Sequence, residues 1–418
     1  MYDTLLVTFL VACGLAAAVT PMAIRLAPKI GAMDIPKDSR RMHDHAMPRF
    51  GGLAIFAGSS AAMLIFLNFD HQITTIVLGG VLIYILGIID DLKDLDPKIK
   101  FAGQTLVAIL MYMQDIRITF ITNYFGEGNS QLGDVWCFLI TVLWIVGITN
   151  TINLIDGLDG LAAGTSAIIS LCIAYAAYIH GTYETAGAML ALAGGCLGFL
   201  PFNFYPAKIF MGDGGSLYLG FMLASLSVTG TVKSAAFMSM IIPVLVLGVP
   251  IFDTLFAILR RLVNKKPIMT ADKGHLHHRL MKLGYGQRRA TLMLYGMTAI
   301  MGVAAVLFSR GLYVEMGGLM AITFMYIYIF LTDSRHMMPQ IRENAKMRQK
   351  VTDRQESKTG IREKTSVLTP EGFLRGKACK KESGGAGHDR HLFYGKGGVK
   401  SGNKSSSIEH NSGRYRSG

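Results

Sequence analysis

The chain has 418 residues, of which 51% are hydrophobic and only 17% are charged. Soluble domains carry about 25% charged residues. This composition, with a mean hydropathy of +0.39, excludes a disordered chain and disfavours a soluble globular protein. The net charge of +13 would fit a nucleic-acid-binding protein only if the basic residues formed a patch. The five cysteines share no metal-ligand spacing, so neither a disulfide framework nor a zinc site is expected from them.

Eleven uncharged apolar runs predict an all-α polytopic membrane protein. Most are 16–20 residues long, enough to cross a hydrocarbon core of about 30 Å at about 1.5 Å per residue. The ninth run contains Pro243 and Pro250 and continues past Asp253, so we expect a broken or kinked helix there. The runs are 5–24, 51–69, 73–89, 101–114, 135–152, 161–179, 185–200, 214–232, 234–252, 290–309 and 316–332.

The loops between these runs differ strongly in positive charge. With the N-terminus outside, the inner loops hold nineteen Lys and Arg residues and the outer loops hold three. Cytoplasmic loops of membrane proteins are enriched in Lys and Arg. The asymmetry therefore predicts an external N-terminus and, after eleven crossings, a cytoplasmic C-terminus.

Residues 333–418 differ in composition from the rest of the chain. They carry 19 Lys and Arg against 9 Asp and Glu, a net +10, with many Gly and Ser residues. Such segments are typically disordered, and a basic cytoplasmic tail can bind anionic lipid headgroups. The sequence predicts a transmembrane domain over 1–332 and a basic, disordered cytoplasmic tail over 333–418. A solvated tail without a role in the chemistry is an equally good interpretation.

Asp90, Asp91 and Asp94 close the third apolar run, on the side predicted to be cytoplasmic. On a helix, Asp90 and Asp94 would share a face. Like charges this close repel unless a cation lies between them, so a divalent metal or a metal-bound phosphate is the economical explanation. A polar helix end paired with Lys93 and Lys100 is the alternative.

A second polar group follows the fifth run, on the same side. Two Asp-Gly pairs, at Asp156 and Asp159, mark a turn where backbone can approach a ligand closely. Asn153 lies about one helical turn before Asp156 and would offer another oxygen ligand on the same side. A plain loop between two membrane helices is the alternative, since Asp and Gly are common in loops.

A third group, Phe210–Ser216, opens the eighth run with a Gly-rich turn around Asp213. Amides at the start of a helix can receive a phosphate. The segment is not a Walker loop, because GxxxxGK[ST] is absent. Asp213 beside three glycines suits Mg²⁺, which takes one or two carboxylates and completes its shell with phosphate oxygens and water.

Two basic loops lie on the same predicted side. The segment His275–Arg279 is surrounded by Lys and Arg residues and has no Cys nearby, so an anion clamp is a better interpretation than a zinc site. The loop after the first run is either an ordinary cytoplasmic loop or a second phosphate contact. Its candidates are Arg40, Arg41, His43 and Arg49. Acidic residues for a metal beside basic residues for phosphate predict phosphoryl transfer from a soluble nucleotide to a membrane-held acceptor.

In this order the motifs resemble those of the polyprenyl-phosphate N-acetylhexosamine-1-phosphate transferases. The matching segments are Asp90–Asp94, Asn153–Gly160, Phe210–Ser216 and His275–Arg279. The resemblance covers about residues 1–332 and implies a multi-pass enzyme of a bacterial cell membrane (the inner, cytoplasmic membrane) with a cytoplasmic active site. It implies transfer of a sugar 1-phosphate from a UDP-N-acetylhexosamine to undecaprenyl phosphate in the lipid bilayer, with release of UMP. The implied cofactor is Mg²⁺, with Mn²⁺ as a substitute, and no nucleic acid is involved; a homodimer is left open beside a monomer.

The resemblance also implies a role for each matching residue. The implied catalytic pair is Asp90 and Asp91. The implied Mg²⁺ ligands are Asp213 and Asn153. The implied uridine contacts are Asp156, Asp159, Asn203 and Phe210, and the implied phosphate contacts are Lys100, His275, His277, His278 and Arg279. A phosphate monoester has a second pKa of about 6, so the acceptor is largely a dianion at neutral pH. The enzyme would position two anions and neutralise their repulsion, and whether Asp90 removes a proton or orients the acceptor stays open.

The histidine motif separates two branches of this family. Leu276 between the histidines, Arg279 after them and Arg49 in the first loop resemble the branch that uses UDP-GlcNAc to start teichoic acid, O-antigen or similar polymers. The runner-up is the UDP-MurNAc-pentapeptide transferase of peptidoglycan synthesis, which typically has three consecutive histidines and then an acidic residue. A transporter or lipid flippase is disfavoured because the polar residues gather at one interface rather than near the midplane. Asp253 is the one deeper carboxylate, and a paired structural residue is its preferred interpretation over a proton relay.

Overall fold

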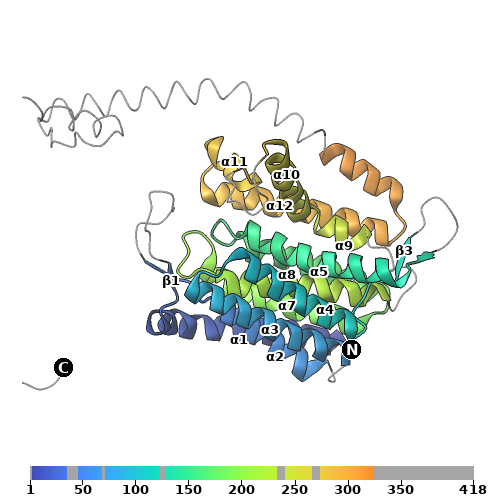
Figure 1. Ribbon diagram of the computed structural model, residues 1–418. Coiled ribbons are helices and arrows are strands. Elements are labelled where there is room, and N and C mark those ends of the chain that lie inside the picture. Colours follow the sequence, from blue (N-terminus) through green and yellow to red (C-terminus); the bar gives the residue numbers. More distant parts are fainter. Residues whose placement is uncertain are drawn as a thin grey trace, which may run out of the picture. The chain divides into compact units, whose positions relative to one another are not determined.

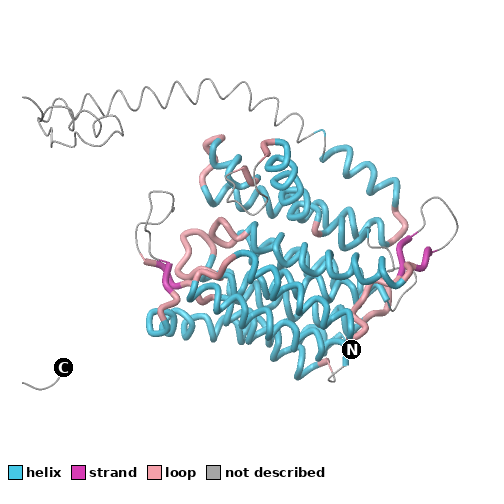
Figure 2. The backbone as a smooth tube through the Cα atoms, in the orientation of Figure 1, coloured by secondary structure: helices cyan, strands magenta, loops and turns pink. Residues whose placement is uncertain are grey.

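The computed structural model describes residues 2–34, 46–67, 71–122, 129–232, 241–265, 274–323 and 325. These residues form a helical bundle with two short antiparallel strand pairs, β1 with β2 and β3 with β4 (Figures 1 and 2). The predicted tail, 333–418, lies outside the described residues, so its disorder and the domain boundary stay predictions. Arg40, Arg41 and His43 also lie outside them.

The helices follow the apolar runs of the sequence closely. They are α1 Tyr2–Ile30, α2 Gly52–Phe66, α3 His71–Lys93, α4 Pro97–Met113, α5 Asp134–Ile155, α6 Leu161–Ile179, α7 Tyr183–Asn203, α8 Gly212–Val232, α9 Ile241–Val246, α10 Gly248–Val263, α11 Leu276–Lys282 and α12 Gln287–Ser309. Residues 313–323 are helical as well. The strand pairs are β1 Met33–Asp34 with β2 Met47–Pro48, and β3 Phe120–Thr122 with β4 Asn129–Gln131.

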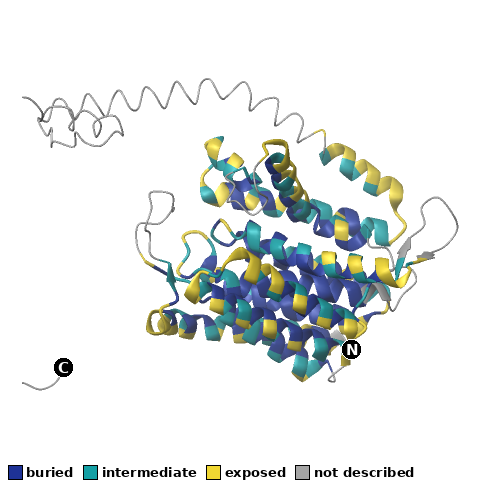
Figure 3. Cartoon of the chain, in the orientation of Figure 1, coloured by how far each residue is buried: buried dark blue, intermediate teal, exposed yellow. Residues whose placement is uncertain are grey.

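Six of the described helices are long and apolar enough to cross a membrane, namely α1, α3, α5, α6, α7 and α12. Large apolar residues are exposed, such as Leu78 on α3 and Leu143 on α5. Exposed positions recur along the outer helices, coloured yellow in Figure 3. Such a surface is unfavourable in water and is expected where lipid surrounds the helices. The chain is therefore a polytopic helical membrane protein, while the count of eleven spans and the orientation stay predictions.

Two helix boundaries follow directly from prolines. Asp96 caps α4 by accepting a hydrogen bond from the Lys98 backbone N–H, and Pro97 begins the helix, where its missing N–H costs nothing. The predicted run 101–114 therefore extends back past Lys100. Farther along, α9 ends at Val246 and α10 begins at Gly248, because Pro250 has no N–H to continue the ladder of helical hydrogen bonds. The expected break in the ninth run is confirmed.

Helix α8 lies at the centre of the core, and glycines let it approach α3. A Cβ added at Gly87 of α3 would lie 2.5 Å from the Gly214 Cα and 2.7 Å from the Asp213 carbonyl oxygen of α8. Only glycine permits this contact of backbone with backbone. The close approach puts Asp90 and Asp91, one turn after Gly87, against the N-terminus of α8.

Candidate active site

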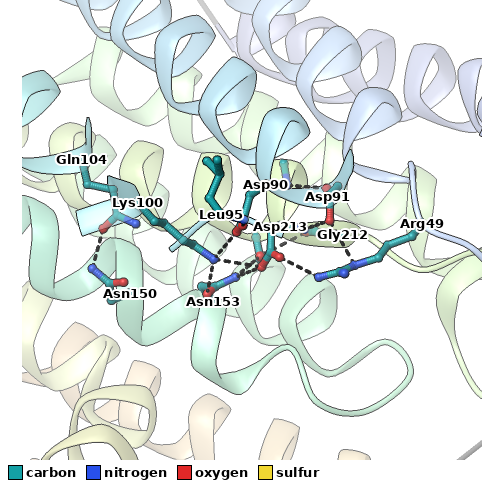
Figure 4. Close-up of polar contacts among 12 residues, drawn as sticks. Arg49, Asp90, Asp91, Leu95, Lys100, Gln104, Asn150, Asn153, Gly212 and Asp213 are labelled. Atoms are coloured by element: carbon teal, nitrogen blue, oxygen red, sulfur yellow. Dashed lines mark hydrogen bonds and ion pairs between the residues drawn. The ribbon is translucent and has the colours of Figure 1, made fainter. Parts of the chain in front are cut away.

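The C-terminal ends of α3 and α5 and the N-terminal end of α8 meet at one end of the bundle, beside β1 and β2. The hairpin of β3 and β4 lies at the opposite end (Figure 1). We call the side chains gathered there the acidic centre: Asp90, Asp91, Asn153 and Asp213 (Figure 4). The structure thus brings together, at one end of the bundle, the predicted catalytic pair and the predicted metal ligands.

Asp213 is the carboxylate on which the polar groups of this centre converge. Arg49 Nη2 lies 2.6 Å from its Oδ2, and Lys100 Nζ lies 3.2 Å from its Oδ1. The Asn153 amide donates to the same Oδ1 at 2.6 Å and to the Ser216 hydroxyl at 2.8 Å. Because both bonds use Nδ2, the Asn153 carbonyl oxygen can face a cation, and it accepts from Lys100 Nζ at 3.3 Å.

The two members of the predicted catalytic pair have different environments. Asp90 Oδ2 lies 2.7 Å from Lys100 Nζ. Asp91 accepts hydrogen bonds from the backbone N–H groups of Asp213 (2.8 Å) and Gly214 (2.9 Å), and its Oδ1 lies 3.0 Å from Arg49 Nε. A carboxylate on the first amides of a helix satisfies donors that have no partner within that helix and interacts favourably with its dipole. Asp91 therefore fastens α3 to the start of α8. Asp90 is instead paired with Lys100, whose long side chain is flexible.

Asp94 does not share a face with Asp90, contrary to the sequence-based expectation. Helix α3 ends at Lys93, and Asp94 follows it with a φ of 49°, exposed to solvent. Asp90 instead accepts from the Leu95 backbone N–H at 2.9 Å. Helix α3 thus ends one residue too early for Asp90 and Asp94 to form an i, i+4 pair. The third carboxylate beside Asp90 and Asp91 is Asp213 of α8.

The oxygens that surround Lys100 Nζ indicate that this centre fits a cation. Asp90 Oδ2, Asp213 Oδ1 and Asn153 Oδ1 lie 2.7, 3.2 and 3.3 Å from this ammonium. Oxygens from three helices therefore surround one positive charge, and carboxylate and amide oxygens are the ligands that Mg²⁺ prefers. Within the described ranges no group of three His, Cys, Asp or Glu residues forms a metal site. In addition to the carboxylates, a metal here would need the Asn153 carbonyl oxygen and oxygens of a bound phosphate as ligands. Mg²⁺ is usually bound in this way, by one or two carboxylates together with substrate phosphates.

The predicted uridine contacts line two neighbouring loops. Asp159 Oδ2 accepts from the Ala207 backbone N–H at 2.9 Å, which joins the two loops. Asn203 is buried, and its amide donates to the Ile209 carbonyl at 2.9 Å. Its Oδ1 is buried without a hydrogen-bond partner among the described residues. Buried acceptors are usually paired, so this oxygen is a candidate for contact with a ligand.

Phe210 connects these loops to the acidic centre through its backbone. Its N–H donates to the Pro48 carbonyl at 2.8 Å, and its carbonyl accepts from the Gly51 N–H at 2.9 Å. This pairing holds Arg49, which lies between those two residues, opposite Asp213. The segment 48–52 is thus a built part of the site rather than an ordinary cytoplasmic loop.

The histidine segment lies beside the Asp156–Gly160 turn. A Cβ added at Gly157 would lie 2.6 Å from His277 Nε2, so the two predicted binding loops touch. The His275 and His277 rings stack with centroids 5.8 Å apart, and those of His277 and His278 lie 4.3 Å apart. Arg279 is exposed and donates to the Gly274 carbonyl at 3.1 Å. No zinc-type ligand group accompanies the histidines in the part of the chain that the structure describes.

Two side chains beside the acidic centre have shifted pKa values. Burial and the nearby carboxylate of Asp213 raise the pKa of Asp156 to about 7, against the opposing effect of Arg49. Burial and the neighbouring His278 lower the pKa of His277 to about 4. At neutral pH His277 is therefore neutral and would act as a hydrogen-bonding group rather than as a cation.

Sequence reasoning gave three residues too little weight. Arg49 binds two carboxylates of the acidic centre, and Ser216 orients Asn153. Asp253 is paired, as expected, but its partner is His275 of the predicted phosphate-binding segment. Each has a feature in the sequence that could have marked it as a site residue. Arg49 shortly precedes two glycines, Ser216 lies one turn after Asp213, and Asp253 is a lone carboxylate in a broken helix.

Comparison with known proteins agrees with this arrangement. Residues 73–231 match the profile of Glycosyl transferase family 4. A Bacillus subtilis protein described as a probable undecaprenyl-phosphate N-acetylglucosaminyl 1-phosphate transferase is 45% identical over 304 residues, covering 72% of this chain and 84% of the relative. A decaprenyl-phosphate N-acetylglucosaminephosphotransferase of Mycolicibacterium smegmatis is 36% identical, covering 68% and 78%. A phospho-N-acetylmuramoyl-pentapeptide-transferase of Shouchella clausii is 32% identical, covering 72% and 97%.

The matched profile contains the motifs Asp90–Asp94, Asn153–Gly160 and Phe210–Ser216, and the likeness to the relatives extends over more residues than the profile does. The acidic centre and the two loops beside it lie within residues 73–231. The chain therefore belongs to the polyprenyl-phosphate N-acetylhexosamine-1-phosphate transferases of glycosyl transferase family 4, and it is a membrane-embedded glycosyltransferase-type phosphotransferase.

Proposed function

We propose that the protein transfers GlcNAc 1-phosphate from UDP-GlcNAc to undecaprenyl phosphate and releases UMP. The reaction would take place at the cytoplasmic face of a bacterial cell membrane, as the first membrane step of a surface glycopolymer. The observation that carries the proposal is the acidic centre, where oxygens of Asp90, Asn153 and Asp213 converge on one cation position. Two phosphate-bearing substrates can approach each other only where their charge is neutralised, and this centre is built to hold positive charge.

The chemistry requires one bond to form and one to break. An oxygen of the acceptor phosphate attacks the β-phosphorus of the donor, and the bond from that phosphorus to the oxygen bridging it to UMP breaks. The acceptor is largely a dianion at neutral pH, so no strong base is required. Asp90 is therefore assigned to orienting the acceptor, and Lys100, now paired with Asp90 and Asp213, to binding phosphate oxygens when substrate enters.

We propose Mg²⁺ as the resident cofactor, held by Asp213 and Asn153. It would neutralise the charge of the diphosphate as the bond to UMP breaks. Asp91 and Arg49 would hold the Asp213 backbone and carboxylate in place from the opposite side. Ser216 would keep the Asn153 carbonyl oxygen facing the same position.

The uridine of the donor would occupy the two loops beside the acidic centre. A uracil ring presents an N–H donor at its edge, and the buried Asn203 Oδ1 is an acceptor without a partner among the described side chains. Phe210, half-buried at the end of the same loop, offers an aromatic face for stacking. The adjoining histidine segment would then contact the sugar phosphate.

The proposed donor can be tested with purified protein and two candidate substrates. We expect UMP and a labelled lipid to form from UDP-GlcNAc and undecaprenyl phosphate in the presence of Mg²⁺, and no product from UDP-MurNAc-pentapeptide. Product from the pentapeptide donor alone would assign the protein to the peptidoglycan reaction, which the 32%-identical relative is named for. Omitting undecaprenyl phosphate is the matched control, because transfer to water would release UMP without lipid.

A further inference from the structure

Asp253 is a buried carboxylate that lies outside the acidic centre. It lies on α10, five residues after the helix begins at Gly248, and its side chain is only 9% exposed. Its Oδ2 lies 2.9 Å from His275 Nδ1, and its Oδ1 accepts from the Leu276 backbone N–H at 2.7 Å. Both carboxylate oxygens thus bind consecutive residues of the histidine segment.

These two bonds fix the histidine segment in two respects. The bond to Leu276 holds the first amide of α11, which has no partner within its own helix. The bond to His275 fixes the ring, because an ionised carboxylate can only accept and Nδ1 must therefore carry a proton. The other ring nitrogen, Nε2, is left available for a different partner. His275 in turn stacks on His277, which lies against Gly157.

We infer that Asp253 is a positioning residue for the donor phosphate, acting through His275. Its carboxylate fastens the histidine segment to α10 and sets which nitrogen of His275 faces the substrate. The inference rests on the proposed function, because it assigns the histidine segment to the diphosphate of the donor. It accounts for a buried charge, which is costly unless it is paired and hydrogen-bonded, at a position where an apolar residue would continue the helix equally well.

An Asp253→Asn variant tests this role, because it keeps the shape and removes the charge. The asparagine carbonyl can still accept from Leu276, but its amide would then point at His275 Nδ1 and demand the opposite tautomer. We expect kcat/KM for UDP-GlcNAc to fall about 10- to 100-fold, the scale found when carboxylates that orient metal-binding histidines are removed. The KM for undecaprenyl phosphate should stay unchanged, and stabilisation of the protein by UDP in a thermal-shift assay should weaken.

A double-mutant comparison separates positioning from general support of the fold. If Asp253 acts through His275, adding Asp253→Asn to His275→Ala should cause no further loss, since coupled residues are not additive. Thr254→Val is the matched control: Thr254 is the buried neighbour of Asp253 on α10, and its hydroxyl has no hydrogen-bond partner among the described residues. This control should keep wild-type activity.

The outcomes also distinguish this inference from the proposed function. Full activity of Asp253→Asn, or a double-variant loss equal to the product of the single losses, would overturn the positioning role even if the wild type uses UDP-GlcNAc. If the wild type turns over only UDP-MurNAc-pentapeptide, the proposed donor fails, and the same series run with that donor still decides the role of Asp253. An equal rise in the KM values of donor and acceptor would also contradict it, because it would indicate a general loss of structure.

Discussion

Replacing Asp213 with Asn should lower turnover by about 10³-fold or more while the protein stays folded. Asp213 is the carboxylate that Arg49, Lys100 and Asn153 share, and in the proposed reaction it holds the metal. Electrostatic groups at a centre of developing charge contribute on this scale. The fold should survive because each cation keeps a second carboxylate: Arg49 keeps Asp91, and Lys100 keeps Asp90.

The measurement is initial rate of labelled lipid formation, with the elution profile in detergent as the check on folding. Asp96→Asn is the matched control, because Asp96 is an exposed carboxylate that caps α4 only four residues before Lys100. It should cost no more than the value of one helix cap, about 1 kcal/mol of stability, and leave the rate unchanged. Wild-type rates in the Asp213 variant would remove this residue from the metal site.

Asn substitutions at Asp90 and Asp91 should both stop transfer, but only the change at Asp91 should destabilise the protein. The Asp91 carboxylate binds two backbone N–H groups of α8 and the Arg49 guanidinium. An amide has one acceptor oxygen and cannot accept from both N–H groups, and a buried donor left without a partner costs about 1–3 kcal/mol. At Asp90, Asn can still accept from the Leu95 N–H, and Lys100 keeps Asp213, so stability should change little.

The order of stability is read from the temperature at which half the detergent-solubilised protein aggregates. We expect Asp91→Asn to lie several degrees below wild type and Asp90→Asn to lie close to it, with transfer lost by about 10²-fold or more in both. Equal stability of the two variants would show that Asp91 does not anchor α8. An active Asp91 variant with lowered stability would confine this residue to a structural role.

The sequence predicts most of the helices and the composition of the site because both depend on local patterns. Apolar runs of membrane-spanning length mark the helices, and Asp-Gly turns mark the helix ends that form the site. The break between α9 and α10 was predictable for the same reason, because Pro250 interrupts the hydrogen bonds of its own helix. Asp94 shows the limit of this reasoning, because helix ends vary by one or two residues, and here α3 ends just before it.

The division of labour within the site depends on contacts that local patterns do not encode. Arg49 reaches Asp213 across 164 residues of sequence, and Asp91 reaches the start of α8 across 122. Asp253 lies on α10 and His275 directly precedes α11, and the chain between them includes residues 266–273, which are outside the described part of the chain. Motifs identify which residue types are present; the packing of α3 on α8 through Gly87 decides which of two adjacent aspartates anchors a helix.

The most direct test of the proposed reaction follows the phosphorus that is transferred. UDP-GlcNAc labelled with ³²P at its β-phosphate is incubated with the purified protein, undecaprenyl phosphate and Mg²⁺. Transfer of GlcNAc 1-phosphate predicts that the label enters the lipid fraction and that the soluble nucleotide product is unlabelled UMP. Label retained in soluble UDP, with GlcNAc alone on the lipid, would contradict the account.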